Sequence, residues 1–163
     1  MKLYIKQRVF TLGERFYVKD EFGNDCYYVE GSFFRIPKRF EIYDMNENLM
    51  ASIDKQIFRF LPHYDITVNH KTYTLKKDFT LFFQRFSLTN TNWVIEGNFT
   101  AHQYQIIRGN KPVMSITKHW FTWGDSYELT IENKDDAVLC LGIVIAIDAA
   151  IDSQTSRTIH SNN

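Results

Sequence analysis

The sequence predicts a mainly β protein, a closed barrel of about 12 strands that encloses a central C-terminal hydrophobic helix. Three observations predict this fold: strand-length segments rich in aromatic residues, an internal repeat, and a single long apolar run near the C-terminus. A chain of 163 residues suits one domain. We expect the barrel domain to span residues 1–151, with its helix at about 136–151, and residues 152–163 to form a polar, flexible tail.

The segments before residue 133 alternate in the manner of strands. Aromatic residues make up 16% of the chain, and together with Val, Ile and Thr they favour a pleated, half-buried surface. Turn-forming clusters recur at short intervals, for example DEFGND from Asp20 and ENKDD from Glu132. Between such clusters lie alternating segments, for example YDITV from Tyr64 and YELTI from Tyr127. About a dozen of these segments predict a meander of hairpins in a sandwich or barrel.

Two parts of the chain resemble each other. The segment MASIDKQIFRFLPHYDITV from Met50 aligns with VMSITKHWFTWGDSYELTI from Val113. One copy could not cover its own apolar face, so the two copies are expected to close on each other, with roughly six strands in each. The identical pairs are Ser52 and Ser115, Ile53 and Ile116, Lys55 and Lys118, Phe58 and Phe121, Tyr64 and Tyr127, and Thr67 and Thr130.

The apolar run DDAVLCLGIVIAIDAAID, from Asp135 to Asp152, predicts a buried helix. Residues 137–147 carry no polar side chain, but about 20 apolar residues are needed to cross a bilayer, so we do not expect a transmembrane protein. Buried strands reach only about 8 residues, and a helix that is apolar on every side must be buried on every side. A ring of about 12 strands needs a plug, so we expect the helix inside the ring, with Asp135 or Asp136 as its N-cap.

Composition excludes several classes of protein. The chain has 19 Lys and Arg against 19 Asp and Glu, so it lacks a general basic field, and we expect no nucleic-acid partner. Cys26 and Cys140 are too few for a disulfide framework, and the charged N-terminal segment lacks the uninterrupted apolar stretch of a secretory signal. These features predict a cytoplasmic location.

No motif predicts catalysis, a metal or a cofactor. The 5 His and 2 Cys residues show no metal-ligand spacing, and the sequence has no nucleophile elbow and no P-loop. Asp148 and Asp152 would share one face of the helix, where paired carboxylates could do acid–base chemistry. The simpler interpretation places them at the barrel mouth, where water, a cation or a Tyr hydroxyl stabilises Asp148. We therefore predict a protein that is not an enzyme and has no cofactor, with an enzyme site at the barrel mouth as an alternative.

Three long segments resemble a known family. They are LYIKQRVFTLGERFYVKDEFGN from Leu3, FFRIPKRFEIYDMNENLMASI from Phe33, and ITKHWFTWGDSYELTIENKDDAVLCLGIVIAIDAAI from Ile116. The chain from about residue 3 to residue 151 resembles the LURP-one-related family, which shares its fold with the tubby C-terminal domain and the phospholipid scramblases. The resemblance implies a closed 12-stranded barrel around a hydrophobic helix, and it brings no catalytic motif. It also implies a binding or regulatory module for anionic phospholipid head groups or a protein partner, or alternatively a scramblase-like role in lipid movement.

A local basic patch is the candidate ligand site. In the segment FFRIPKRF, the cations Arg35, Lys38 and Arg39 lie among aromatic residues, an arrangement that could seat an anionic head group. The alternative is a solvated loop between two strands. We match none of tubby's lipid-binding residues to a position of this chain, so none is carried over.

Two lysines occur at equivalent positions in both copies of the repeat. Strict alternation places Lys55 and Lys118 at the ends of inward-facing rows. In a hairpin centred on Phe60, Lys55 would lie opposite Asp65, and the second copy would place Lys118 opposite Glu128. These residues are predicted to form structural ion pairs, with ligand binding by the lysines as the alternative.

Overall fold

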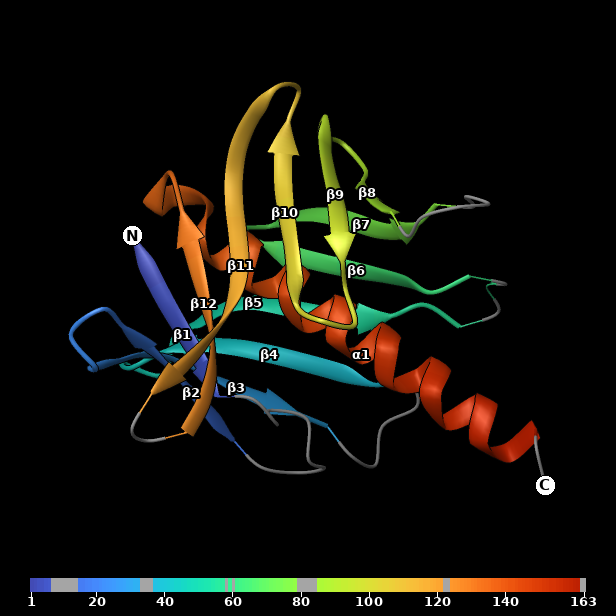
Figure 1. The fold of residues 1–163 in the computed structure, drawn as a ribbon, viewed down its shortest axis with the longest axis horizontal. Coiled ribbons are helices and arrows are strands. Elements are labelled where there is room, and N and C mark those ends of the chain that lie inside the picture. The colour runs from blue at the N-terminus through green and yellow to red at the C-terminus, as the bar shows by residue number, and fades with distance from the viewer. Residues whose placement is uncertain are drawn as a thin grey trace.

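The structure, a computed structural model, describes residues 1–6, 15–32, 37–57, 59, 61–78, 85–121 and 124–161. Within these residues, twelve antiparallel strands form a closed barrel, in which each strand pairs with its neighbours in the sequence and β1 pairs with β12 (Figure 1). The strands are β1 (Lys2–Lys6), β2 (Phe16–Asp20), β3 (Asp25–Gly31), β4 (Arg39–Asp44), β5 (Leu49–Lys55), β6 (His63–Val68), β7 (Lys71–Lys77), β8 (Arg85–Leu88), β9 (Trp93–Asn98), β10 (Gln103–Arg108), β11 (Lys111–Phe121) and β12 (Gly124–Ile131). The predicted mainly β barrel is confirmed.

The two copies of the repeat fold into equivalent hairpins. Lys55 pairs with Tyr64 between β5 and β6, and Lys118 pairs with Tyr127 between β11 and β12. Each residue of the second pair is the repeat counterpart of a residue in the first. The equal register shows that the internal sequence repeat is also a structural repeat.

The C-terminal helix occupies the inside of the barrel. A 3₁₀ turn, η1 (Lys134–Asp136), leads into α1 (Ala137–Ser161), which Figure 1 shows running between strands on its two sides. The consecutive residues 139–147 are all buried, and they cover more than two helical turns, so every side of this part of α1 is in contact with protein. The helix packs tightly against β6 at Gly142, where an added Cβ would lie 2.9 Å from the Cγ2 of Ile66.

Both ends of α1 differ in detail from the expectation. Asp135 and Asp136 lie within η1, and the cap is Asn133, whose side-chain oxygen accepts the backbone N–H of Asp135 at 3.1 Å. The helix also continues past residue 151 to Ser161, into the segment expected to be a flexible tail. No Gly or Pro follows Gly142, so the sequence contains no strong helix breaker there. Within the described residues, no helix is long and apolar enough to cross a membrane.

Candidate binding surface

Three tyrosines form a row across the outside of β2, β3 and β4. Tyr17 pairs with Tyr28, and Tyr28 pairs with Tyr43. Their rings are in contact: the centroids of Tyr28 and Tyr43 are 5.0 Å apart with the rings nearly parallel, and those of Tyr17 and Tyr28 are 6.2 Å apart. The row faces outward because Val18, one residue along β2, is fully buried and side chains alternate along a strand.

The tyrosine row continues onto β5 and has exposed ends. Across a bulge between β4 and β5, Tyr43 pairs with Leu49. Leu49 is 53% exposed and Tyr17 is 42% exposed, whereas Tyr28 in the middle is only 5% exposed. We call the row Tyr17, Tyr28, Tyr43 and Leu49 the tyrosine ladder.

Arg15 covers the centre of the ladder. Its guanidinium carbon lies 4.2 Å from the centroid of the Tyr28 ring, and its Nε donates to Glu30 at 2.8 Å. A guanidinium stacked on a ring and held by a carboxylate has little freedom to move. Next to Tyr28 in the row, the Tyr43 hydroxyl donates to Glu41 at 3.0 Å. Burial is the main cause that raises the pKa of Tyr43, and the hydrogen bond to Glu41 is the second. The hydroxyl therefore stays protonated and can donate.

Carboxylates line the outer face beside the ladder. Glu30 and Glu41 pair directly across β3 and β4, and Asp54 and Asp65 pair directly across β5 and β6. Directly opposed like charges destabilise a sheet unless other groups compensate them. Arg39 lies between two of these acids, with its Nε 3.0 Å from Glu41 and its Nη1 3.6 Å from Asp54.

The predicted basic patch is thereby only partly available to a ligand. Arg35 lies outside the described residues, Lys38 is exposed, and Arg39 is engaged by Glu41 and Asp54. The anionic head-group site at these three cations stays a prediction. Of the two cations of this patch that the structure describes, Arg39 lies between carboxylates, and Lys38 is exposed.

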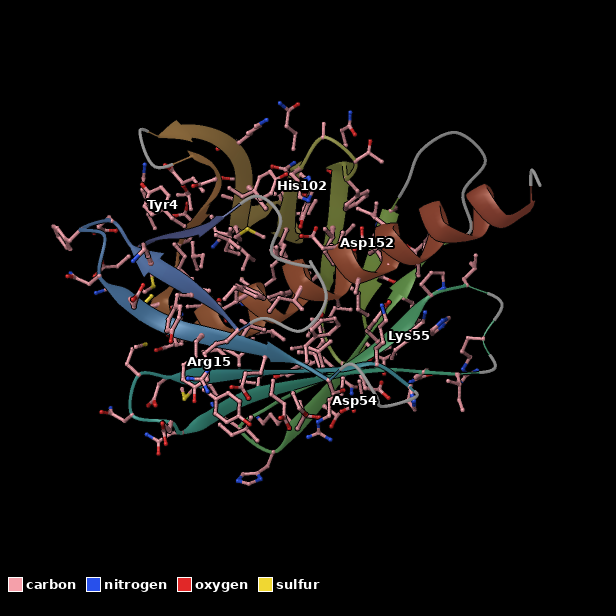
Figure 2. The ribbon with its side chains drawn as sticks, turned by 90° about the horizontal axis from the view of Figure 1, so that it is seen from below. Tyr4, Arg15, Asp54, Lys55, His102 and Asp152 are labelled. Carbon is pink, nitrogen blue, oxygen red and sulfur yellow. The ribbon has the colours of Figure 1, made fainter. Side chains whose placement is uncertain are left out.

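The predicted pairing of Lys55 opposite Asp65 is wrong by one residue. Lys55 lies opposite Tyr64, and Asp65 lies opposite Asp54, so Lys55 and Asp65 project to opposite faces of the sheet. Figure 2 shows the neighbours Asp54 and Lys55 on different sides of β5. The observed register therefore differs by one residue from the predicted one. Because side chains alternate along a strand, this difference places Asp65 on the opposite face from Lys55. The inward orientation expected for Lys55 is consistent with the burial of Ala51 and Ile53 on the same row.

The second copy shows the same offset. Lys118 pairs with Tyr127, and Glu128 pairs with Thr117. Glu128 instead receives the Lys2 amine at 2.7 Å and the Tyr4 hydroxyl at 3.0 Å. Burial alone would raise the pKa of Glu128, but the hydrogen bonds from Lys2 and Tyr4 outweigh burial, and the pKa is lowered. The four residues Asp65, Glu128, Lys55 and Lys118 therefore do not meet as two directly opposed pairs.

A polar cluster lies where α1 leaves the barrel. The Nε2 atom of His102 lies 2.9 Å from Oδ1 of Asp148, and the His102 ring stacks on Tyr127 with centroids 4.0 Å apart. His102 belongs to the turn between β9 and β10 and has a positive φ of 50°. Burial, and to a lesser degree the charge of Asp152, raises the pKa of Asp148, while His102 acts in the opposite direction. The sequence predicts water, a cation or a Tyr hydroxyl beside Asp148 and does not identify His102.

Tyr104 adds a buried hydroxyl to this cluster. The residue is 4% exposed, and its hydroxyl has no hydrogen-bond partner among the residues that the structure describes. Burial, and then the charge of Asp148, raise the pKa of Tyr104 well above its usual value. Within the described part of the chain, no three His, Cys, Asp or Glu side chains gather as metal ligands would.

Comparisons with known proteins agree with the fold. The model of the family described as LURP-one-related matches residues 1–148. The uncharacterized protein YxjI of Bacillus subtilis (strain 168) is 29% identical over 160 residues, which cover 98% of this chain and 99% of YxjI. The X-ray structure of a protein from Arabidopsis thaliana matches with a TM-score of 0.61 and 13% identity, over 91% of this chain and 90% of that one. At 13% identity, this likeness concerns the fold alone.

Proposed function

The chain belongs to the LURP-one-related family, and on that premise we propose that it is a non-catalytic binding module whose partner is a protein bound on the outside of the barrel. The tyrosine ladder is the proposed binding surface. A regulatory role would follow if partner binding were controlled, as the resemblance to the family suggested.

One observation carries this proposal: α1 fills the barrel, so the outer face and the rim are left for recognition. Residues 139–147 of α1 are buried among the strands, which leaves the interior occupied by the chain itself. On the outer face, the ladder holds tyrosines paired in register across three strands. Tyr and Arg are the residue types enriched where protein partners bind most strongly.

The alternative ligand, an anionic phospholipid head group, is supported by fewer contacts. Arg39 of the proposed head-group site already faces Glu41 and Asp54, and an anion would have to compete with both carboxylates. A scramblase-like role would require α1 to leave the barrel. That movement would expose the buried residues 139–147 to solvent or lipid and undo their packing.

The cytoplasmic location is part of the proposal. Cys26 and Cys140 are both free, and burial raises the pKa of the Cys26 thiol to about 11, which keeps it protonated and unreactive. A protein with two such thiols suits a reducing compartment.

Site-specific photo-crosslinking tests the proposed surface. A photoreactive amino acid replaces Tyr17 in one variant and Lys111, an exposed residue of β11, in a control. The proposal expects a discrete protein adduct in cells from position 17 and none from position 111. Adducts with lipid only, or equal adducts from both positions, would contradict it.

A further inference from the structure

We propose that the tyrosine ladder and its flanking carboxylates bind a basic protein segment, one in which Arg or Lys side chains stand beside apolar ones. This inference rests on the proposed function, because it names the chemistry of the partner at the same surface. The proposed partner is a protein, and binding of an anionic lipid surface instead is an outcome that the test can detect.

The charge of the surface points to a cationic partner. The opposed acids Glu30, Glu41, Asp54 and Asp65 contribute four carboxylates to adjoining strands of one outer face. Two described arginines contact them: Arg15 binds Glu30, and Arg39 binds Glu41 and Asp54. These four carboxylates outnumber the two arginines that contact them, and this excess of acids favours a cationic partner.

The carboxylates remain within reach of a partner. The side chains of Glu30, Glu41 and Asp54 are 40%, 31% and 36% exposed. A carboxylate that already accepts one guanidinium keeps further lone pairs for a second donor. Added cations from a partner would also reduce the repulsion between Glu30 and Glu41, which lie directly opposite each other.

The apolar part of the surface sets where the partner's apolar side chains would lie. Leu49 and Tyr17 are the exposed ends of the row, and Met45, in the turn between β4 and β5, is 46% exposed. The central Tyr28 is already covered by Arg15. A partner can therefore bury apolar area at the two ends while its cations reach the acids beside the row. Because the row stands on paired strands, little ordering is needed on this side of the interface.

Two matched peptides probe the charge preference. Each is a synthetic 12-residue peptide with one Trp and two Leu, and one carries four Arg where the other carries four Glu. Titration into isotope-labelled full-length protein, followed by amide chemical shifts, gives affinity and location together. We expect the Arg peptide to bind about tenfold or more tightly than the Glu peptide, to weaken as salt is raised, and to shift signals of β2 to β5.

Paired variants distinguish an effect of the proposed surface from an effect of the protein's net charge. Glu41→Gln combined with Asp54→Asn should weaken the Arg peptide about tenfold, whereas Glu96→Gln combined with Glu132→Gln, with the same change in net charge, should not. Likewise, Leu49→Ser should weaken binding, and Ile57→Ser should not, since Ile57 is similarly exposed at 49% but lies off the row. Thermal unfolding of each variant checks that the barrel remains folded.

The outcomes distinguish this inference from the proposed function. Equal affinity for both peptides, or no effect of the Glu41 and Asp54 changes, overturns the basic partner even if position 17 still crosslinks to a protein. In that case the binding module stands with a partner of other chemistry. Binding of the protein itself, with no peptide present, to vesicles of phosphatidylcholine with 20% phosphatidylserine, with shifts of the same β2 to β5 signals, would replace the protein partner with a lipid surface and overturn both.

Discussion

The His102 imidazole joins the turn between β9 and β10 to the central helix through its 2.9 Å contact with Asp148. The same ring stacks on Tyr127 of β12, so three separate elements meet at one side chain. Figure 2 shows His102 on the side of the barrel where the end of the helix bearing Asp152 lies. This relationship ties the central helix to two parts of the barrel wall at the barrel mouth.

Asp148→Asn should change how stability depends on pH. The pKa of Asp148 is raised by burial, so the folded state holds this proton more tightly than the unfolded state does. The resulting stabilisation is complete below the ordinary carboxyl pKa of 3.8 and is lost as pH rises through the raised value. The Asn variant cannot ionise. Its free energy of unfolding, measured in urea, should therefore increase relative to wild type as pH rises through this range.

Asp152→Asn is the control for this measurement, because Asp152 lies on the same helix but is exposed. It should produce a smaller change of the same sign, since its charge contributes to the raised pKa of Asp148. If Asp148→Asn instead loses stability relative to wild type with rising pH, the contact with His102 outweighs burial. An ionised Asp148 can only accept, so Nε2 would then be a strong donor.

Tyr104→Phe should stabilise the protein. The hydroxyl is buried without a partner among the described residues, and such a group costs about 1–3 kcal/mol relative to an apolar replacement of the same shape. Tyr4→Phe is the matched control, because its hydroxyl donates to Glu128 and its removal should cost about 1 kcal/mol. Urea unfolding of both variants gives the comparison. A loss of stability in Tyr104→Phe would mean that the hydroxyl has a partner, such as a buried water.

The residues show how far the sequence could predict this structure. Alternation placed Lys55 on the inward row with Ile53, since a period of two is a local property. The predicted register of β5 and β6 is wrong by one residue, because register depends on turn geometry and alternation does not define the turn. The pairing of Tyr17 with Tyr28 could have been found, because two residues separate each of them from the DEFGND turn. The contact of His102 with Asp148 could not have been found, because it depends on the position of the helix along the barrel axis.

Gly97→Ala should be strongly destabilising. Gly97 has a φ of +138°, and an added Cβ would lie 2.5 Å from the backbone oxygen of Gln103 and 2.6 Å from the Cα of Tyr104. Backbone atoms of a paired strand cannot move aside cheaply, so we expect a loss of about 3 kcal/mol or more. Gly109→Ala is the control: its φ is +61°, an added Cβ meets nothing within 4 Å, and the loss should be near 1 kcal/mol. Equal losses would show that only the backbone conformation matters.

The packing of α1 against β6 can be tested with a double-mutant cycle at Gly142 and Ile66. An alanine at position 142 would gain about 1 kcal/mol of helix propensity but would bring its Cβ to 2.9 Å from the Cγ2 of Ile66. That atom branches from Cβ and cannot swing away, so overpacking of about 1–3 kcal/mol should outweigh the gain. Ile66→Ala alone should cost about 2–5 kcal/mol through the cavity it leaves. In that background the added methyl enters empty space, so Gly142→Ala should become stabilising. This reversal of sign, measured by urea unfolding, would locate the helix against β6 inside the barrel. A Gly142→Ala effect that is the same in both backgrounds would mean that the two residues are not in contact, and that the helix lies elsewhere in the ring.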